Sequence, residues 1–299
     1  MTTIEDYVYE KKPRSVSQLK QYEKCPMSYR LARIDREWKR PAAWLYQGIA
    51  VHAVAQHYLL RRLGYEDTLG YDAELGYADT GPMTREEAYE LFKESYADAT
   101  NEAAEITPNL GWWFRSGMYD GYEDIPRRWD IGLEQVDKLV DWIETHPEEK
   151  IWVAPDGKPG IELEIDVELG GVQIRGFIDA VIEEVVDSDP EEYTTELKIR
   201  DYKTGNEPGD DFQLAVYAVA LKKMYGVEIE FGEYWMAGKK GKKAFATHPF
   251  DLTDWPEEKV AARFLELEAK LEAGEFNPLP EPDKCKFCDV SLSCPFSMA

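Results

Sequence analysis

Cysteine and histidine are scarce in this sequence, which has 299 residues and only 4 of each. It contains no apolar run long enough to span a bilayer and no basic-then-apolar start of the kind that marks a signal peptide. We therefore expect an intracellular protein of the cytoplasm, without a membrane partner.

Positive charge is also in short supply, because 35 Lys and Arg face 59 Asp and Glu and leave a formal net charge of −24. Such a chain does not bind polyanions over its general surface. Two interpretations stay open: a solvated acidic shell, or an acidic surface that repels nucleic acid except along a local basic path. The candidates for such a path are Lys198, Arg200, Lys222, Lys223 and the cluster of Lys239, Lys240, Lys242 and Lys243.

The remaining composition is that of a folded protein. Hydrophobic residues make up 43% of the chain and aromatic residues 13%, which argues against disorder. A length of 299 residues allows one large domain or two smaller ones. No sequence repeat and no low-complexity tract divides the chain.

Two apolar-rich stretches, 172–184 and 193–203, predict strands that carry charged residues at defined positions. The first contains Gly176 and Asp179, and the second ends with Asp201, Tyr202 and Lys203. Residues two apart on a strand project from one face, so Asp201 and Lys203 lie together. Two carboxylates and an ammonium group suit metal-assisted cleavage of a phosphodiester, in which a divalent cation generates hydroxide and stabilises the developing charge.

Two predicted helices carry further polar residues. Gln213 and Tyr217 are four residues apart on a helix over 210–225 and therefore share a face. The stretch 44–62 predicts an amphipathic helix that contains Gly48 and His52 in a GxxxH pattern. A histidine on an apolar helix is usually a packed core residue, which is how we interpret His57.

One of the four cysteines lies near the start of the chain, and the other three lie near its end. The tail has Cys285, Cys288 and Cys294 in a C-x2-C-x5-C pattern, and Cys25 precedes a proline, as Cys294 does. Short loops of this length let thiolates converge on one metal centre. Four thiolates suit a [4Fe-4S] cluster or a structural zinc ion equally well, whereas an intracellular setting argues against disulfides.

Taken together, these motifs resemble the PD-(D/E)xK nuclease superfamily. GxxD, (D/E)xK and QxxxY occur in that order, as in RecB-type exonuclease domains, and GxxxH precedes them. The segment SxSQLxxYxxCPxxYRL and the cysteine layout resemble the iron staple of CRISPR-associated RecB-type exonucleases and of AddB-type nuclease domains. This resemblance covers 15–62 and 161–295, and it favours iron–sulfur over zinc.

The resemblance assigns a role to each motif residue. Asp179 and Asp201 would bind Mg²⁺ or Mn²⁺, completed by His52 and the carbonyl of Tyr202, and Lys203 would orient the attacking water. Gln213 and Tyr217 would support the site or the DNA beside it. The implied reaction is exonucleolytic hydrolysis of single-stranded DNA ends in a prokaryotic or phage-infected cell, with a structural cluster held by the four cysteines.

We accordingly expect an α/β fold with a restriction-endonuclease-like core, a mixed sheet flanked by helices. Four regions follow: N-terminal helices (1–62), a helical insertion (63–150), the nuclease core (151–253), and a terminal helix with the cysteine-rich tail (254–299). Aromatic residues of the insertion either stack on bases or, as we favour, pack its own core. We interpret residues 1–14 as a poorly structured start and Ser17 as a helix cap.

Some assignments compete with this scheme. Glu196 and Lys198 also spell (D/E)xK, but strand alternation puts them on the face opposite Asp201, where they would form an exposed pair. In the alternating strand 161–169 the acidic residues share one wet face, from which Glu164 could contribute a third carboxylate. These acidic residues are Glu162, Glu164, Asp166 and Glu168.

The sequence has no GxxxxGK[ST] motif, so a helicase would have to be a partner protein. Recombination or CRISPR adaptation proteins are the other expected partners. The rival interpretation is a catalytically silent DNA-binding module of such a complex. A second rival is a zinc-stabilised binding protein in which the DxK triplet is incidental.

Overall fold

The computed structural model describes residues 7–66, 76–77, 81–189 and 192–299. Its helices are α1 (Val16–Lys24), α2 (Pro26–Tyr29), α3 (Ala43–Arg62), α4 (Arg85–Ile106), α5 (Gly121–Thr145), α6 (Asp211–Tyr225), α7 (Glu257–Glu272) and α8 (Pro282–Lys286), with short η2 (Arg30–Ile34) and η3 (Leu110–Trp112) turns. Its strands are β1 (Tyr65–Glu66), β2 (Gly76–Tyr77), β3 (Lys150–Ile151), β4 (Ile161–Leu169), β5 (Val172–Asp189), β6 (Glu192–Lys203), β7 (Phe231–Met236), β8 (Phe245–Ala246) and β9 (Phe250–Asp251).

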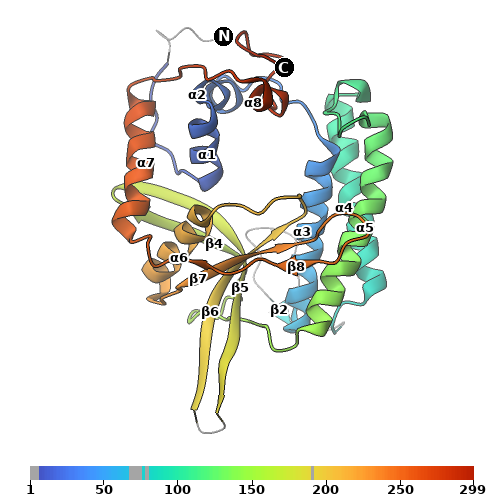
Figure 1. Cartoon of the computed structure of the whole chain (residues 1–299), viewed down its shortest axis with the longest axis vertical. Helices are drawn as coiled ribbons and strands as arrows, with labels where there is room; N and C mark the ends of the chain where they lie inside the picture. The colour runs from blue at the N-terminus through green and yellow to red at the C-terminus, as the bar shows by residue number, and fades with distance from the viewer. Residues whose placement is uncertain (1–6, 67–75, 78–80, 190–191) are drawn as a thin grey trace.

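The central sheet is mixed and has seven strands. Its order is β3-β5-β6-β7-β8, with β4 also paired to β5 and β9 to β7. Strands β6 and β7 run parallel because α6 connects them as a crossover, and the other pairs are antiparallel. The distal parts of β5 and β6 leave the sheet as a long hairpin that projects from the body (Figure 1).

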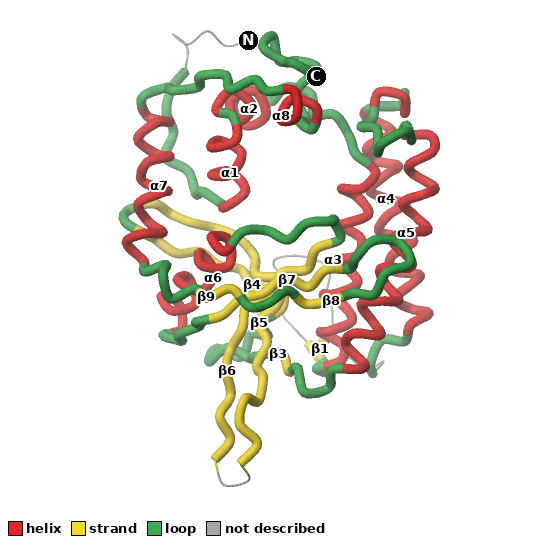
Figure 2. Tube along the Cα trace, in the orientation of Figure 1, coloured by secondary structure: helices red, strands yellow, loops and turns green. Residues whose placement is uncertain are grey.

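Helices cover both faces of the sheet, as Figure 2 shows. Residues of α1, α6 and α7 pack on one face and form what we call the α6-side core. Residues of α3, α4 and α5 pack on the other and form the bundle-side core. The predicted mixed α/β fold is thus confirmed, and the stretch 63–150 shares a core with the sheet through α4 and α5.

Strands β4 and β5 pass from one core to the other at a single point. Ile161 pairs with Ala180 in the bundle-side core, whereas Leu163 pairs with Ile178 in the α6-side core. Glu162 lies between them with a φ of +44°, a left-handed conformation that non-glycine residues seldom adopt. The strands can change cores there because this residue breaks the alternation of side chains.

The beginning of the chain is more ordered than the sequence indicated, at least from residue 7 onward. Arg14 forms a parallel bridge with Ile174, donating its amide to the carbonyl of Gln173 and accepting from the amide of Arg175. Its buried guanidinium pairs with Glu268 of α7. The helix cap is also corrected, because Ser15 and not Ser17 accepts the amide of Gln18.

The two ends of the described chain meet at one end of the molecule. There α8 lies beside α2 (Figure 1), and the amide of Arg40 donates to the carbonyl of Asp289 at 2.8 Å. The apolar core of this region is small: Leu31, Ala32 and Val290 are its buried members. The cysteines are found here.

Candidate active site

The charged residues of the DxK triplet lie at the end of β6, in the middle of the sheet. Asp201 is 2% exposed, and its Oδ2 lies 2.6 Å from Nζ of Lys203. Lys203 remains partly open to solvent and sits above the ring of Tyr234, 5.4 Å from its centroid. Strand alternation brings the two groups together, and neighbouring strands hold them rigidly.

Helix α6 supplies the amide that orients Asp201. Gln213 donates Nε2 to Asp201 Oδ1 at 2.6 Å and to the hydroxyl of Tyr217 at 3.2 Å. Both residues are on the first two turns of the helix, directly after the loop from β6. The QxxxY spacing thus puts an amide and a hydroxyl beside the carboxylate.

Asp179 on β5 faces the same point from the neighbouring strand. Its Oδ2 accepts the backbone amide of Tyr202 at 2.8 Å and lies 3.5 Å from Nδ1 of His52 on α3. Helix α3 approaches closely because Gly48 has no side chain: a Cβ there would lie 3.1 Å from Oγ1 of Thr204, which follows the DxK triplet. The GxxxH pattern therefore combines a close approach of the helix with an imidazole one turn later.

Glu162 is a member of this cluster that the sequence did not single out. Its Oε1 lies 3.8 Å from His52 Nδ1 because the left-handed backbone turns its carboxylate inward. The prediction that Glu164 supplies a third carboxylate is wrong, because Glu164 is exposed and its Oε1 lies 3.8 Å from Nε of Arg175. No local signal separates the two glutamates, since both belong to the acidic face of one alternating strand.

Burial and mutual repulsion shape the ionisation of this cluster. Burial, together with the charge of Asp179, raises the pKa of Asp201 to about 6, against the opposing pull of Lys203. Burial likewise raises the pKa of Asp179. Burial alone would lower the pKa of His52, but Asp179, Glu162 and Asp201 outweigh it and raise that pKa to about 9.

A divalent cation fits this arrangement chemically. One ligand atom from each of His52, Glu162 and Asp179 lies within 4.8 Å of the others, and Asp201 adds a carboxylate from the adjacent strand. Oxygen and imidazole donors suit Mg²⁺ and Mn²⁺. Carboxylates whose pKa values are raised by crowding are stabilised when a cation replaces the missing positive charge.

The competing triplet and the proposed basic path are corrected by the structure. Glu196 lies opposite Glu184 in the ladder, and Lys198 pairs with Glu184 rather than with Glu196. Arg200 is 2% exposed and is held by Glu149 and Glu233, so it cannot line a path for a ligand. Through Glu149, this buried ion pair joins the connection between α5 and β3 to the sheet.

The other members of the predicted path are distributed over the surface. Lys222 and Lys223 form exposed ion pairs with Glu228 and Glu257. The lysine cluster of 239–243 occupies the connection between β7 and β8, where the amide of Gly241 donates to Glu134.

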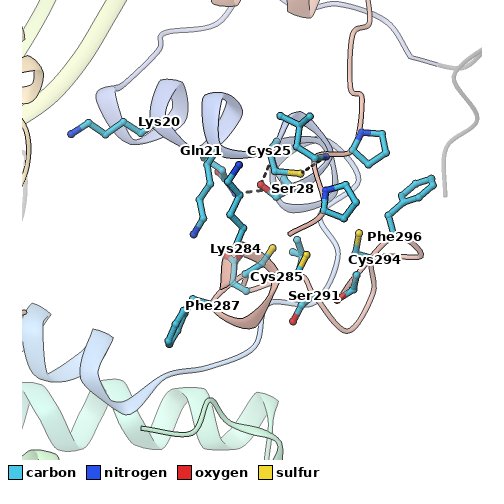
Figure 3. Close-up of a pocket in the computed structure, with 18 residues that line it drawn as sticks. Lys20, Gln21, Cys25, Ser28, Lys284, Cys285, Phe287, Ser291, Cys294 and Phe296 are labelled. Atoms are coloured by element: carbon cyan, nitrogen blue, oxygen red, sulfur yellow. Dashed lines mark hydrogen bonds between the residues drawn. The ribbon is translucent and has the colours of Figure 1, made fainter. Parts of the chain in front are cut away.

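All four cysteines line one pocket between the chain ends, with a volume of about 280 Å³. Figure 3 shows Cys25 from the N-terminal helices facing Cys285 and Cys294 from the tail, and Cys288 completes the lining. In the described part of the chain no three of these sulfur atoms lie within 4.8 Å of one another. Burial raises the thiol pKa of Cys288 and of Cys294.

Comparison with known proteins agrees with the geometry. The model of the family described as "PD-(D/E)XK nuclease superfamily" matches residues 13–295. The "Gene 69 protein" of Mycobacterium phage D29 is 51% identical over 94% of this chain and 96% of its own length. The protein of the same name from Mycobacterium phage L5 is 48% identical over the same shares.

A solved structure titled "Crystal structure of SSO0001" covers 59% of this chain and 76% of its own with 16% identity. Its TM-score of 0.33 is too low to carry an argument. Among the described residues, no helix is long and apolar enough to cross a membrane. The family model spans nearly the whole sequence, including every strand and helix that contributes to the buried acidic cluster, and we conclude that the chain belongs to the PD-(D/E)XK superfamily of metal-dependent nucleases.

Proposed function

We propose that this chain is a RecB-type exonuclease that hydrolyses phosphodiester bonds at the ends of single-stranded DNA. The observation that carries the proposal is the buried cluster of Asp179, Asp201 and Lys203, with Gln213 fixing one carboxylate. Burying so many charged groups is unfavourable for stability. Their assembly from three strands and two helices therefore points to a function.

Each residue has a role that its contacts support. Asp179, Asp201, His52 and the carbonyl of Tyr202 would hold Mg²⁺ or Mn²⁺, and the bound ion supplies activated water and charge stabilisation. Lys203 projects beside Asp201, where its ammonium can position that water or the phosphate oxygens. Gln213 keeps one oxygen of Asp201 occupied, so the other stays directed at the site.

The group we propose for the pocket between the chain ends is a [4Fe-4S] cluster rather than zinc, in line with the cysteine layout of the iron-staple nucleases that the sequence resembles. A tetrahedral zinc ion requires sulfur atoms about 3.8 Å apart, given Zn–S bonds of about 2.3 Å, and no three sulfurs are within 4.8 Å. A cubane holds its cysteines farther apart because each sulfur binds a different iron. Cys25, Cys285, Cys288 and Cys294 would then join the chain ends, without a redox role in hydrolysis.

The setting we propose is a phage-infected bacterial cell, which the two phage relatives support. The absence of a P-loop motif from the sequence supports a separate helicase as the source of unwound ends. Proteins of recombination or of CRISPR adaptation are further partners of this kind.

The decisive experiment measures Mn²⁺-dependent release of nucleotides from end-labelled single-stranded DNA. Asp201→Asn and Lys203→Met should each abolish release, because one removes a cation ligand and the other the neighbouring ammonium. Glu168→Gln is the matched control, since this exposed residue of β4 lies on the outer face and should leave the rate unchanged.

A covalently closed single-stranded circle separates exonuclease from endonuclease activity, and it should remain intact while the linear strand of the same sequence is degraded. If wild type and both variants are equally inert on several DNA substrates with Mg²⁺ and Mn²⁺, the silent binding module is the correct interpretation.

A further inference from the structure

A groove lies next to the acidic cluster, on the side of the N-terminal segment. It has a volume of about 730 Å³ and lies between residues 13–20 and strand β5. Gln213 and Tyr217 are part of its lining, and Gln213 is the residue that donates to Asp201. The groove and the site are therefore neighbours that share Gln213.

The charge of this groove differs from that of the rest of the molecule. Among the described residues that line it, none is Asp or Glu, although the chain has 59 of them in 299 residues. The lining residues instead include Lys20, Arg175, Ser15, Ser17 and Phe177. These are the groups that bind phosphates and stack on bases.

The local backbone adds to this preference for a polyanion. The first turn of α1 lines the groove, and the amides at a helix start carry the positive end of the helix dipole.

We propose that this groove binds the single DNA strand next to the phosphate that is cleaved. Lys20 and Arg175 contact backbone phosphates and Phe177 stacks on a base. The volume accommodates roughly one or two nucleotides, being within the range of ordinary ligand sites. The proposal rests on the exonuclease function proposed above, and it explains how a chain with a net charge of −24 admits a strand.

Both cations are available to a phosphate, although each has an ionic partner. Lys20 pairs with Asp210 at 2.8 Å and Arg175 with Asp166 at 2.5 Å, and all four side chains are at least 32% exposed. Exposed pairs of this kind are worth only about 0–1 kcal/mol, so a phosphate can replace the carboxylate. Arg14 also lines the groove, but it is committed to the buried Glu268.

The test is the salt dependence of binding, measured with a fluorescent oligothymidylate in the Asp201→Asn background, which leaves the strand intact. Each lost contact with a single-strand phosphate reduces the slope of log K against log salt by about 0.7. Lys20→Gln with Arg175→Gln should therefore reduce the slope by about 1.4. The matched control is Lys222→Gln with Lys223→Gln, which removes the same charge from exposed ion pairs outside the groove.

A second variant gives an effect of the opposite sign. Asp166→Asn removes the nearer of the two carboxylates beside Arg175, the other being Glu164, and should strengthen binding, which a merely structural role for this ion pair would not produce. An unchanged slope in the groove variant, or an equal loss in the control pair, overturns the proposal.

Hydrolysis of bis(p-nitrophenyl) phosphate distinguishes the groove from the chemistry, because this small diester does not extend into the groove. When the groove variant keeps the native Asp201, it should retain hydrolysis of this diester, while its KM for oligonucleotides rises. If the native chain hydrolyses neither substrate but the slopes change as expected, the groove stands and the exonuclease function fails.

Discussion

The acidic cluster and the cysteine pocket differ in what surrounds and holds their side chains. The acidic cluster lies where two hydrophobic cores meet, and its side chains are held by hydrogen bonds from β6 and α6. The cysteine pocket lies between two chain ends, beside a core whose buried members are Leu31, Ala32 and Val290.

The two regions therefore differ in what keeps their side chains in place. At the acidic cluster the fold holds the ligands and thereby accepts unfavourable charge repulsion, which shows in the raised pKa values of Asp179 and Asp201. At the cysteine pocket, little packing is present to hold the chain ends, so a bound group would contribute much of the order. The first site should therefore serve chemistry and the second stability.

The largest expected effect is that of Asp179→Asn. Loss of several kcal/mol of charge stabilisation corresponds to a rate reduction of about 10³-fold or more. Its folded-state pKa is raised, so at pH 7 the charged group opposes folding, and the metal-free variant should melt at the same or a higher temperature than wild type. Single-turnover kinetics and calorimetry measure the two effects; a lower melting temperature would contradict this view of the site.

A smaller effect concerns pH. The pKa of His52 is raised to about 9 and that of Asp201 to about 6 in the metal-free protein, so cation binding must displace a proton from His52 at neutral pH. Affinity for Mn²⁺ should rise by up to about tenfold per pH unit between about 6.5 and 8.5. Titration calorimetry in two buffers measures the released proton, and His52→Asn should remove this dependence.

The smallest effect on the rate is expected from Cys285→Ser at the other centre. We expect nuclease activity within about tenfold of wild type at low temperature, together with loss of brown colour and absorbance near 400 nm. The melting temperature should fall, and about 1 kcal/mol corresponds to about 2–4 °C in a chain of this size. Protease should then cleave the tail first. An inactive variant with unchanged stability would refute the division between the two centres.

The sequence was sufficient for the elements whose periodicity is local. The alternation of 161–169 predicted a strand that the structure places at Ile161–Leu169, and the apolar pattern of 44–62 predicted the helix Ala43–Arg62. The order and spacing of the DxK and QxxxY motifs put Asp201, Lys203 and Gln213 together, because strand parity and helix periodicity each fix which side chains share a face.

Only the tertiary structure decided the features that depend on distant partners. Glu162 turns inward because its backbone adopts a left-handed conformation where the strands change cores. Arg200 is buried because Glu149 and Glu233 reach it from other elements, and Arg14 joins β5 from far away in the chain. The local sequence pattern shows which side chains are charged and to which face of a regular strand they would point. It does not record where the strand bends or which carboxylate arrives beside it. These contacts select the acid that faces the candidate metal site and the cations whose ion pairs stay exposed.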